Sequence, residues 1–216
     1  MIVIPSPLTA DINELKSFLT EAEGKVDIFQ IDINDGTFLN NKSVLPESLR
    51  GIITNLQFDF HLMVVNPIDW IERCVSVRAK RIIGQIEYMA SQSEFVKKCQ
   101  DFGVKKGLAL DINTDISKID REVLPLIDVI LLMDYPAGVG GQAFDDRVLE
   151  KIKNLIELRK KEDLSYHICC DGGINEVSII KVKEAGADEV TVGKQLFTGD
   201  FVDNISKLIG INELEI

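Results

Sequence analysis

Two carboxylates and one imidazole in this sequence stand at positions from which they could do chemistry together. Asp32 and His61 each lie near the end of a β-rich run, and Asp171 directly follows a third such run. If these runs end at one edge of a fold, the three side chains are able to hold a divalent metal ion. They are equally able to supply an acid and a base on opposite sides of a small substrate. The alternative is that each side chain only satisfies a nearby backbone group or a water molecule.

The alternation of residue types along these runs predicts which side chains face inward. Gln30 shares one strand face with Asp32, and Met63 shares one with His61. The other face of the first run is apolar, as expected for side chains that pack beneath helices on the outside of a barrel. We therefore expect Gln30, Asp32 and His61 to face a lumen near its mouth.

Three glycine-rich turns follow the later β-rich runs and favour an anion site. They contain Gly138, Gly140 and Gly141, then Gly172 and Gly173, and finally Gly193 followed by Lys194. Glycine lets backbone N–H groups approach an anion closely, and a following helix N-terminus adds a favourable dipole. Tight turns alone would explain any one of them, but three at successive runs indicate phosphate binding. Lys194 would either add charge there or extend into solvent.

The β-rich runs alternate strictly with amphipathic helical segments. The predicted strands cover residues 2–4, 27–33, 57–64, 81–86, 106–110, 127–133, 166–170 and 189–192. The predicted helices cover residues 11–23, 46–54, 67–77, 91–102, 116–123, 145–161, 176–185 and 201–208. Such alternation implies parallel strands with right-handed crossovers, and eight units indicate a closed (β/α)8 TIM barrel. We expect a single domain over residues 1–216, with its chemistry at the C-terminal ends of the strands.

Charge and composition narrow the choice of partners. Lys and Arg number 24 against 35 Asp and Glu, so the net charge is −11, and the sequence has no run of basic residues. This balance argues against nucleic acid or an anionic membrane as the main partner. No apolar stretch approaches the ~20 residues of a membrane span, and the N-terminus lacks the basic region of a signal peptide. We expect a cytoplasmic protein that binds a small molecule.

Short motifs along the chain resemble the ribulose-phosphate 3-epimerase family in their order and spacing. They are Pro5-Ser6 with Ala10-Asp11, Asp32-Ile33-Asn34-Asp35-Gly36, His61-Leu62-Met63 with Asn66-Pro67, Leu131-Leu132-Met133, Gly140-Gly141-Gln142 and Asp171-Gly172-Gly173-Ile174. The resemblance implies a barrel of the ribulose-phosphate-binding type that interconverts D-ribulose 5-phosphate and D-xylulose 5-phosphate. It also implies one divalent metal ion (Zn, Fe, Mn or Co) held by two His and two Asp. A homo-oligomer would be in keeping with the family, although no sequence feature identifies an interface.

The resemblance carries the family's roles over to particular residues. Asp32 and Asp171 match the proton-transfer pair, which also ligates the metal, and His61 matches one metal-binding histidine. The implied substrate-contacting residues are Ser6, His61, Met63, Met133, Gly138, Gly140, Gly141, Gly172, Gly173, Gly193 and Lys194. Inversion of a carbon beside a carbonyl needs a proton-transfer group on each face, which two aspartates can supply. A metal ion can stabilise the enediolate between them, and different surroundings can push the two pKa values apart.

Some positions depart from the family pattern. Gln30 stands where the family has a second metal-binding histidine, and glutamine is a poorer ligand than imidazole for zinc or iron. Gln85 also replaces a histidine, and Lys194 replaces a serine. In one account Asp32, His61 and Asp171 hold the metal, with Gln30 or water as the fourth ligand. In the other, the metal site has weakened, and the chain acts on another phosphosugar or binds one without turnover.

Overall fold

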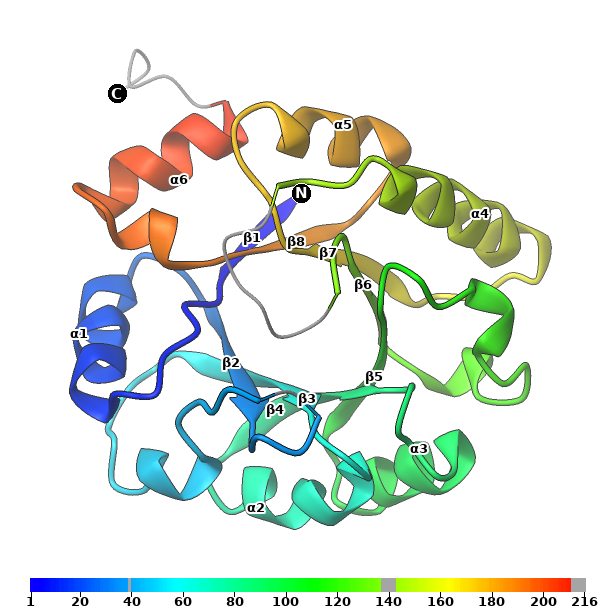
Figure 1. The fold of residues 1–216 in the computed structure, drawn as a ribbon, viewed down its shortest axis with the longest axis horizontal. Helices are drawn as coiled ribbons and strands as arrows, with labels where there is room; N and C mark the ends of the chain where they lie inside the picture. Colours follow the sequence, from blue (N-terminus) through cyan, green and yellow to red (C-terminus); the bar gives the residue numbers. More distant parts are fainter. Residues whose placement is uncertain (39, 137–142, 211–216) are drawn as a thin grey trace.

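Parallel strands arranged in a ring form the centre of the molecule. The structure is a computed structural model that describes residues 1–38, 40–136 and 143–210. The strands in these residues are β1 (Ile2–Pro5), β2 (Ile28–Asn34), β3 (Gln57–Met63), β4 (Ala79–Gln85), β5 (Lys105–Leu110), β6 (Val129–Met133), β7 (His167–Asp171) and β8 (Glu189–Val192). They pair in parallel in the order β1-β8-β7-β6-β5-β4-β3-β2. Because β1 also lies beside β2, the sheet curls into a barrel (Figure 1), which confirms the predicted fold class.

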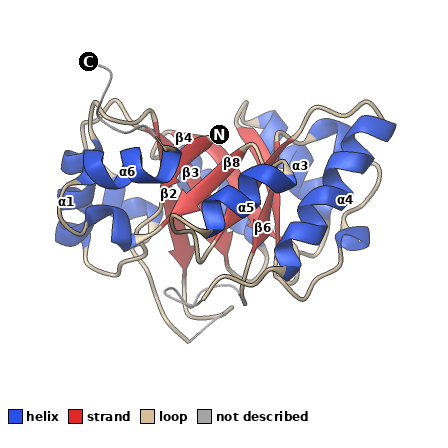
Figure 2. Ribbon diagram, turned by 90° about the horizontal axis from the view of Figure 1, so that it is seen from above, coloured by secondary structure: helices blue, strands red, loops and turns tan. Residues whose placement is uncertain are grey.

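Helices surround this ring of strands. The α-helices in the described residues are α1 (Ile12–Ala22), α2 (Ile71–Val75), α3 (Gln92–Asp101), α4 (Arg147–Lys161), α5 (Ser178–Ala185) and α6 (Phe201–Ile209). Figure 2 shows them flanking the strands on the outside. Side-chain caps begin three of them: Asp11 accepts a hydrogen bond from the Asn13 N–H, Ser91 accepts one from the Glu94 N–H, and Asp200 accepts one from the Asp203 N–H. Within the described ranges, no helix is long and apolar enough to cross a membrane.

Two of the eight predicted helices are wrong. Segment 46–54 holds only the 3₁₀ helix η1 (Pro46–Leu49), and segment 116–123 holds only η3 (Ile116–Lys118). Gly51 has a φ of +79°, a left-handed conformation that ends a helical turn. In the second segment, Ile119 directly after η3 is extended, with a ψ of 126°, so the turn does not continue as an α-helix. Three further 3₁₀ turns are η2 (Pro67–Trp70), η4 (Leu124–Leu126) and η5 (Lys194–Phe197).

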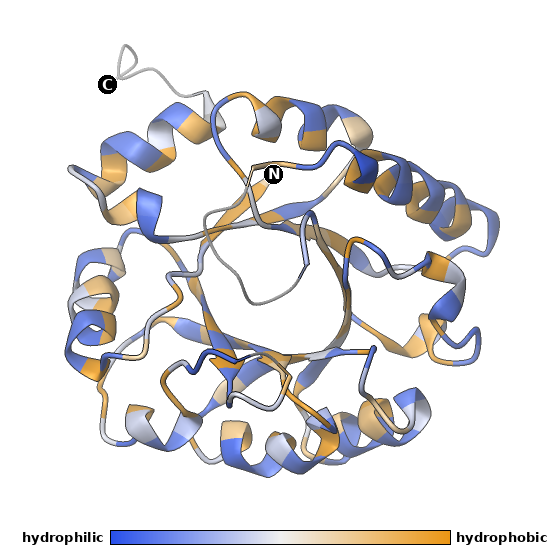
Figure 3. Cartoon of the chain, viewed as in Figure 1, coloured by the Kyte–Doolittle hydropathy of each residue, from blue (hydrophilic) through white to orange (hydrophobic). Residues whose placement is uncertain are grey.

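The main apolar core lies between the strands and the helices. Phe29, Ile31 and Ile33 belong to it, so the outward face predicted for β2 is confirmed. α4 contributes Val148, Ile152 and Leu155 to the same core. The outer side of α4 is hydrophilic (Figure 3), which is the usual pattern for a helix covering a barrel.

A second, smaller apolar layer fills the inside of the barrel. It consists of Met63, Ile83, Ala109, Val129, Leu131, Met133 and Cys169. Nearer the N-terminal ends of the strands, the buried Arg81 guanidinium lies 2.5 Å from Asp59 Oδ2 and 2.7 Å from Glu189 Oε2. One guanidinium thus serves two buried carboxylates, an arrangement that is costly to break. These layers close the lumen from below and leave the C-terminal mouth for a site.

Candidate active site

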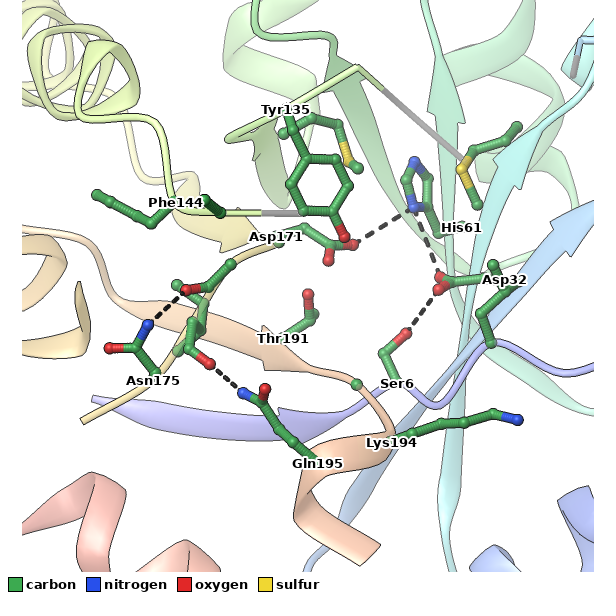
Figure 4. A pocket seen from close by; sticks show the side chains of 18 of the residues that line it. Ser6, Asp32, His61, Tyr135, Phe144, Asp171, Asn175, Thr191, Lys194 and Gln195 are labelled. Carbon is green, nitrogen blue, oxygen red and sulfur yellow. Dashed lines mark hydrogen bonds and ion pairs between the residues drawn. The ribbon is translucent and has the colours of Figure 1, made fainter. Parts of the chain in front are cut away.

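The C-terminal ends of β2, β3 and β7 bring Asp32, His61 and Asp171 together. Strand register places Asp32 directly beside His61, and Asp171 reaches them from the far side of the ring. The Nδ1 atom of His61 lies 3.6 Å from Asp32 Oδ1 and 3.6 Å from Asp171 Oδ2 (Figure 4). The imidazole is fully buried between the two carboxylates. The structure therefore assembles the trio that the sequence singles out.

Gln85 at the end of β4 orients the imidazole. Its amide oxygen lies 2.9 Å from His61 Nε2, and because that oxygen only accepts, Nε2 carries the proton and donates it. The other nitrogen, Nδ1, is buried and has no hydrogen-bond partner in the described part of the chain. Once Nδ1 has lost its proton, an imidazole held in this way offers this nitrogen to a cation, as metal-binding histidines do.

The surroundings of this cluster shift the pKa values of the two aspartates in opposite directions. Burial raises the pKa of Asp32, and the nearby negative charge of Asp171 adds to this effect, although contacts with His61 and Gln30 oppose it. Burial also acts on Asp171, but there His61 outweighs it and lowers the pKa below its usual value. For His61, burial lowers the pKa, but Asp171 and Asp32 outweigh it and raise the pKa to about 10. One carboxyl group thus tends to keep a proton while the other is ionised, which is the condition for an acid–base pair.

Gln30 lies between the same two carboxylates. Its Nε2 donates to Asp32 Oδ1 at 2.9 Å and to Asp171 Oδ2 at 3.0 Å, and it lies 3.2 Å from Ser6 Oγ. The Ser6 hydroxyl in turn donates to Asp32 Oδ2 at 2.9 Å. β1 and β2 are therefore tied together at the mouth by polar side chains.

These residues fit a divalent cation. The ligand atoms of Asp32, His61 and Asp171 all lie within 4.8 Å of one another. Tetrahedral ligands at the usual bond lengths of a zinc site are about 3.3 Å apart, close to the 3.6 Å from Nδ1 to each carboxylate oxygen. An unpartnered imidazole nitrogen facing two carboxylates is the chemistry that such an ion requires.

A cavity of about 740 Å³ opens over the trio. Of the residues predicted to contact substrate, Ser6, His61, Met63, Met133, Gly172, Gly173, Gly193 and Lys194 line it. The predicted residues Gly138, Gly140 and Gly141 lie outside the described residues. Lys194 extends away from the carboxylates in Figure 4, and its ammonium group pairs with Glu14 at 2.7 Å.

Sequence reasoning missed several residues of this cavity. Tyr135 directs its hydroxyl group towards Asp171 (Figure 4), and Thr191 and Asn175 also line the cavity. Asp134 is fully buried beside the glycine turn after β7, and burial raises its pKa to about 8, with repulsion from Asp171 adding to the effect. Applying the strand-end rule to β6 as well as β2, β3 and β7 would have found Asp134 and Tyr135, which directly follow Met133.

The fold and the site define a (β/α)8-barrel protein with a buried cluster of two carboxylates and an imidazole that fits a divalent cation. The family model described as "Ribulose-phosphate 3 epimerase family" matches residues 2–197. The chain belongs to the ribulose-phosphate 3-epimerase family, as its motifs indicate, and thereby to a family of isomerases.

Relatives named as ribulose-phosphate 3-epimerases are similar in sequence to this chain over most of their length. The ribulose-phosphate 3-epimerase of Treponema pallidum is 34% identical over 199 residues, with 90% of each chain covered. That of Synechocystis is 32% identical over 202 residues, with 91% of this chain and 87% of the relative covered. That of Aquifex aeolicus is 35% identical over 176 residues, with 81% and 79% covered.

Solved structures at low identity support the fold alone. The 3-hexulose-6-phosphate synthase of Salmonella typhimurium aligns with a TM-score of 0.67 and 12% identity over 98% of both chains. Phosphoribosyl anthranilate isomerase of Thermus thermophilus aligns with a TM-score of 0.64 and 14% identity, over 98% of this chain and 96% of that one. The predicted homo-oligomer and the predicted cytoplasmic location stay predictions.

Proposed function

We propose that this chain epimerises a phosphorylated ketose at C3 and interconverts D-ribulose 5-phosphate and D-xylulose 5-phosphate. The observation that carries the proposal is the pair Asp32 and Asp171, which faces one cavity with pKa values shifted in opposite directions. Family membership and relatives named as this epimerase support the same reaction. The substrate is a small phosphorylated sugar rather than a nucleic acid or a membrane.

In this proposal the two aspartates exchange a proton with opposite faces of the reacting carbon. Asp171, whose pKa is lowered, removes the C3 proton of one epimer, and Asp32, whose pKa is raised, returns a proton to the other face. The roles reverse for the opposite direction. Ser6 holds Asp32 in place through its hydrogen bond at the mouth. Gln30 Nε2 bonds both carboxylates and so bridges the two aspartates.

The cation would be held by Asp32, His61 and Asp171. This set of oxygen and nitrogen ligands can bind Zn, Fe, Mn or Co. When bound, a divalent ion supplies positive charge that stabilises an enediolate. Gln85 prepares the site by keeping the proton on His61 Nε2.

The phosphate group would bind at the turns after β7 and β8. Gly172 and Gly173 have φ values of +114° and +40°, so the chain turns tightly there before α5 begins. Gly193 opens onto the same cavity, and a Cβ atom there would lie 3.8 Å from Ser6 O. Backbone N–H groups near a helix N-terminus suit a phosphate dianion without a basic side chain. Met63 and Met133 would contact the sugar from the lumen side.

A second candidate function is supported by Gln30. Its N–H₂ group faces the two carboxylates. An imidazole at the same position would be a stronger ligand for zinc or iron than this amide. A barrel with a weakened metal site could act on another phosphosugar, or bind one without turning it over.

The test is proton exchange at C3 of D-ribulose 5-phosphate in D2O, followed by NMR. The protein is treated with chelator, and Zn²⁺, Fe²⁺, Mn²⁺ or Co²⁺ is then added back. We expect deuterium at C3 together with xylulose 5-phosphate. Asp32→Asn and Asp171→Asn should each lower epimerisation by about 10²- to 10⁴-fold. Asp101→Asn on α3, which removes an exposed carboxylate, is the matched control.

The outcomes separate the two candidates. Full activity of Asp32→Asn or Asp171→Asn would refute the two-aspartate mechanism. Absence of exchange with every metal, in folded protein, would remove this epimerase activity. Thermal stabilisation by sugar phosphates in that case would favour a binding role.

A further inference from the structure

The amide nitrogen of Gln30 makes hydrogen bonds, whereas its amide oxygen makes none in the described part of the chain. Its Nε2 donates to Asp32 and Asp171, whereas Oε1 is buried and has no hydrogen-bond partner in the described part of the chain. The whole residue is only 1% exposed, so water does not reach the amide freely. A buried carbonyl oxygen without a partner is costly and calls for an explanation.

The same two oxygens that accept from Gln30 also face the imidazole. Asp32 Oδ1 and Asp171 Oδ2 are the atoms that lie 3.6 Å from His61 Nδ1. Four residues therefore surround one small volume with two carboxylate oxygens, an imidazole nitrogen and an amide. In this orientation the amide directs N–H groups at that volume, which suits two carboxylates but repels a cation.

A half-turn of the amide removes this conflict. Amide oxygen and nitrogen are nearly the same size, so rotation about the last side-chain bond exchanges them without moving the rest of Gln30. The turn breaks no hydrogen bond at Oε1, because that atom makes none, but it gives up the two bonds from Nε2 to Asp32 and Asp171. A bound cation would replace these bonds, since the same two carboxylate oxygens face it. The Ser6 hydroxyl lies 3.2 Å from Nε2 and donates its one proton to Asp32 Oδ2. After the turn, this proton can stay on Asp32 or be redirected to Gln30 Oε1, because the hydroxyl group rotates.

We propose that Gln30 is a reversible metal ligand: its Nε2 bridges Asp32 and Asp171 without metal, and its Oε1 turns to the cation when one binds. With Gln30 turned, the protein offers three oxygens and one nitrogen. Oxygen-rich sites favour Mn²⁺ and Mg²⁺, whereas imidazole favours Zn²⁺ and Fe²⁺. The site therefore discriminates against Zn²⁺ more than one with a second imidazole would. The inference rests on the metal site of the function proposed above, but its test does not depend on turnover.

Titration of chelator-treated protein with Mn²⁺, followed by electron paramagnetic resonance, tests the ligand role. Gln30→Met keeps the shape of the side chain but offers neither an amide oxygen nor an N–H group. We expect it to weaken Mn²⁺ binding by about ten-fold or more, and Gln30→Glu to bind Mn²⁺ more tightly than the wild type. Gln195→Met, which alters another glutamine of the same cavity, is the control and should bind Mn²⁺ as the wild type does. Circular dichroism verifies that each variant is folded.

The opposite order of affinities overturns the inference. If the amide keeps its N–H₂ group towards the ion, removing it relieves repulsion, and Gln30→Met then binds Mn²⁺ at least as tightly as the wild type. A gain in Gln30→Glu without a loss in Gln30→Met would also overturn the inference, because it would show only the effect of the added charge.

Two further measurements address the turn itself and the selectivity. In protein labelled with ¹⁵N at glutamine, the side-chain N–H₂ signal of Gln30, identified by its loss in Gln30→Met, should shift when diamagnetic Mg²⁺ is added. Gln30→His should raise the affinity for Zn²⁺ more than that for Mn²⁺. An unshifted signal in Mg²⁺-loaded protein, or equal gains for both ions, would contradict the proposal.

Failure of this inference is distinguishable from failure of the proposed function. If no Mn²⁺ binds but C3 exchange persists in chelator, the reversible ligand is refuted and the epimerase remains. If Mn²⁺ affinities follow the expected order but no C3 exchange occurs with any metal, the ligand role is supported and the epimerase fails.

Discussion

Replacing Gly172 with alanine should destabilise the protein through a contact that the structure defines. Gly172 follows β7 with a φ of +114°, and a Cβ atom built there would lie 1.9 Å from Asp134 Oδ1 and 2.5 Å from a ring carbon of Tyr135. Asp134 is fully buried, so its short side chain has little room to withdraw. The strained backbone costs about 2 kcal/mol and the overlap about 2 kcal/mol more. A total of about 4 kcal/mol is a large part of the stability of an ordinary domain, about 5–15 kcal/mol.

Gly103→Ala separates the two contributions. Gly103 has a φ of +67°, which L-residues reach more easily than the +114° of Gly172, and nothing lies within 4 Å of an added Cβ. It therefore carries only a smaller backbone cost of about 1 kcal/mol. Urea unfolding, followed by the fluorescence of the single, buried tryptophan Trp70, gives the free energy of unfolding of each variant. We expect Gly172→Ala to lose about 3 kcal/mol more than Gly103→Ala. Equal losses in the two variants would refute the steric argument, since Asp134 and Tyr135 would then have moved aside at no cost.

Three other predictions concern charged and polar side chains. Burial raises the pKa of Asp59 from 3.8 to about 6. Its stabilising contribution, about 3 kcal/mol, should therefore be fully present below about pH 4 and be lost as the pH rises through about 6. Urea unfolding of the wild type and of Asp59→Asn between about pH 4 and pH 7 checks this loss of stability. If the free energy of unfolding of the two proteins depended on pH in the same way, the prediction would be contradicted. Gln85→Leu removes the acceptor that holds His61 Nε2–H, so calorimetry should show Mn²⁺ affinity lower by about 10- to 100-fold, whereas an unchanged affinity would exclude this role. Lys194→Ala should change KM little, because the ammonium group pairs with Glu14, and a rise in KM of about ten-fold would instead indicate contact with the phosphate.

Much of the barrel follows from local rules. Strict alternation of apolar strands with amphipathic helices predicts parallel strands joined by right-handed crossovers. Residue parity along β2 and β3 correctly divides Phe29 and Ile31 on the outside from Asp32 and His61 on the inside. The two wrong helices have a local cause as well, since Gly51 is left-handed in the first segment and Ile119 is extended in the second.

The meeting of Asp32 with Asp171 at one mouth could also be expected from the sequence, because all strands of a parallel barrel end at the same face. What the sequence alone determines is therefore the fold class, the face on which each strand residue lies and the end of the barrel where polar side chains gather. These properties depend on the period of the strand and on parallel pairing, which are set by neighbours in the chain.

Only the tertiary structure decides how those side chains contact one another. The bond from His61 to Gln85, the bridge of Gln30 between two carboxylates and the pairing of Lys194 with Glu14 all join different strands or turns. Lys194 and Glu14 are separated by 180 residues in the chain. Such contacts depend on ring closure, strand stagger and the choice of rotamer in a packed space, and a one-dimensional pattern carries none of these. The sequence thus indicates which groups reach the mouth of the barrel. The closed barrel sets the distances between them, which of their atoms carry protons, and the orientation of the Gln30 amide.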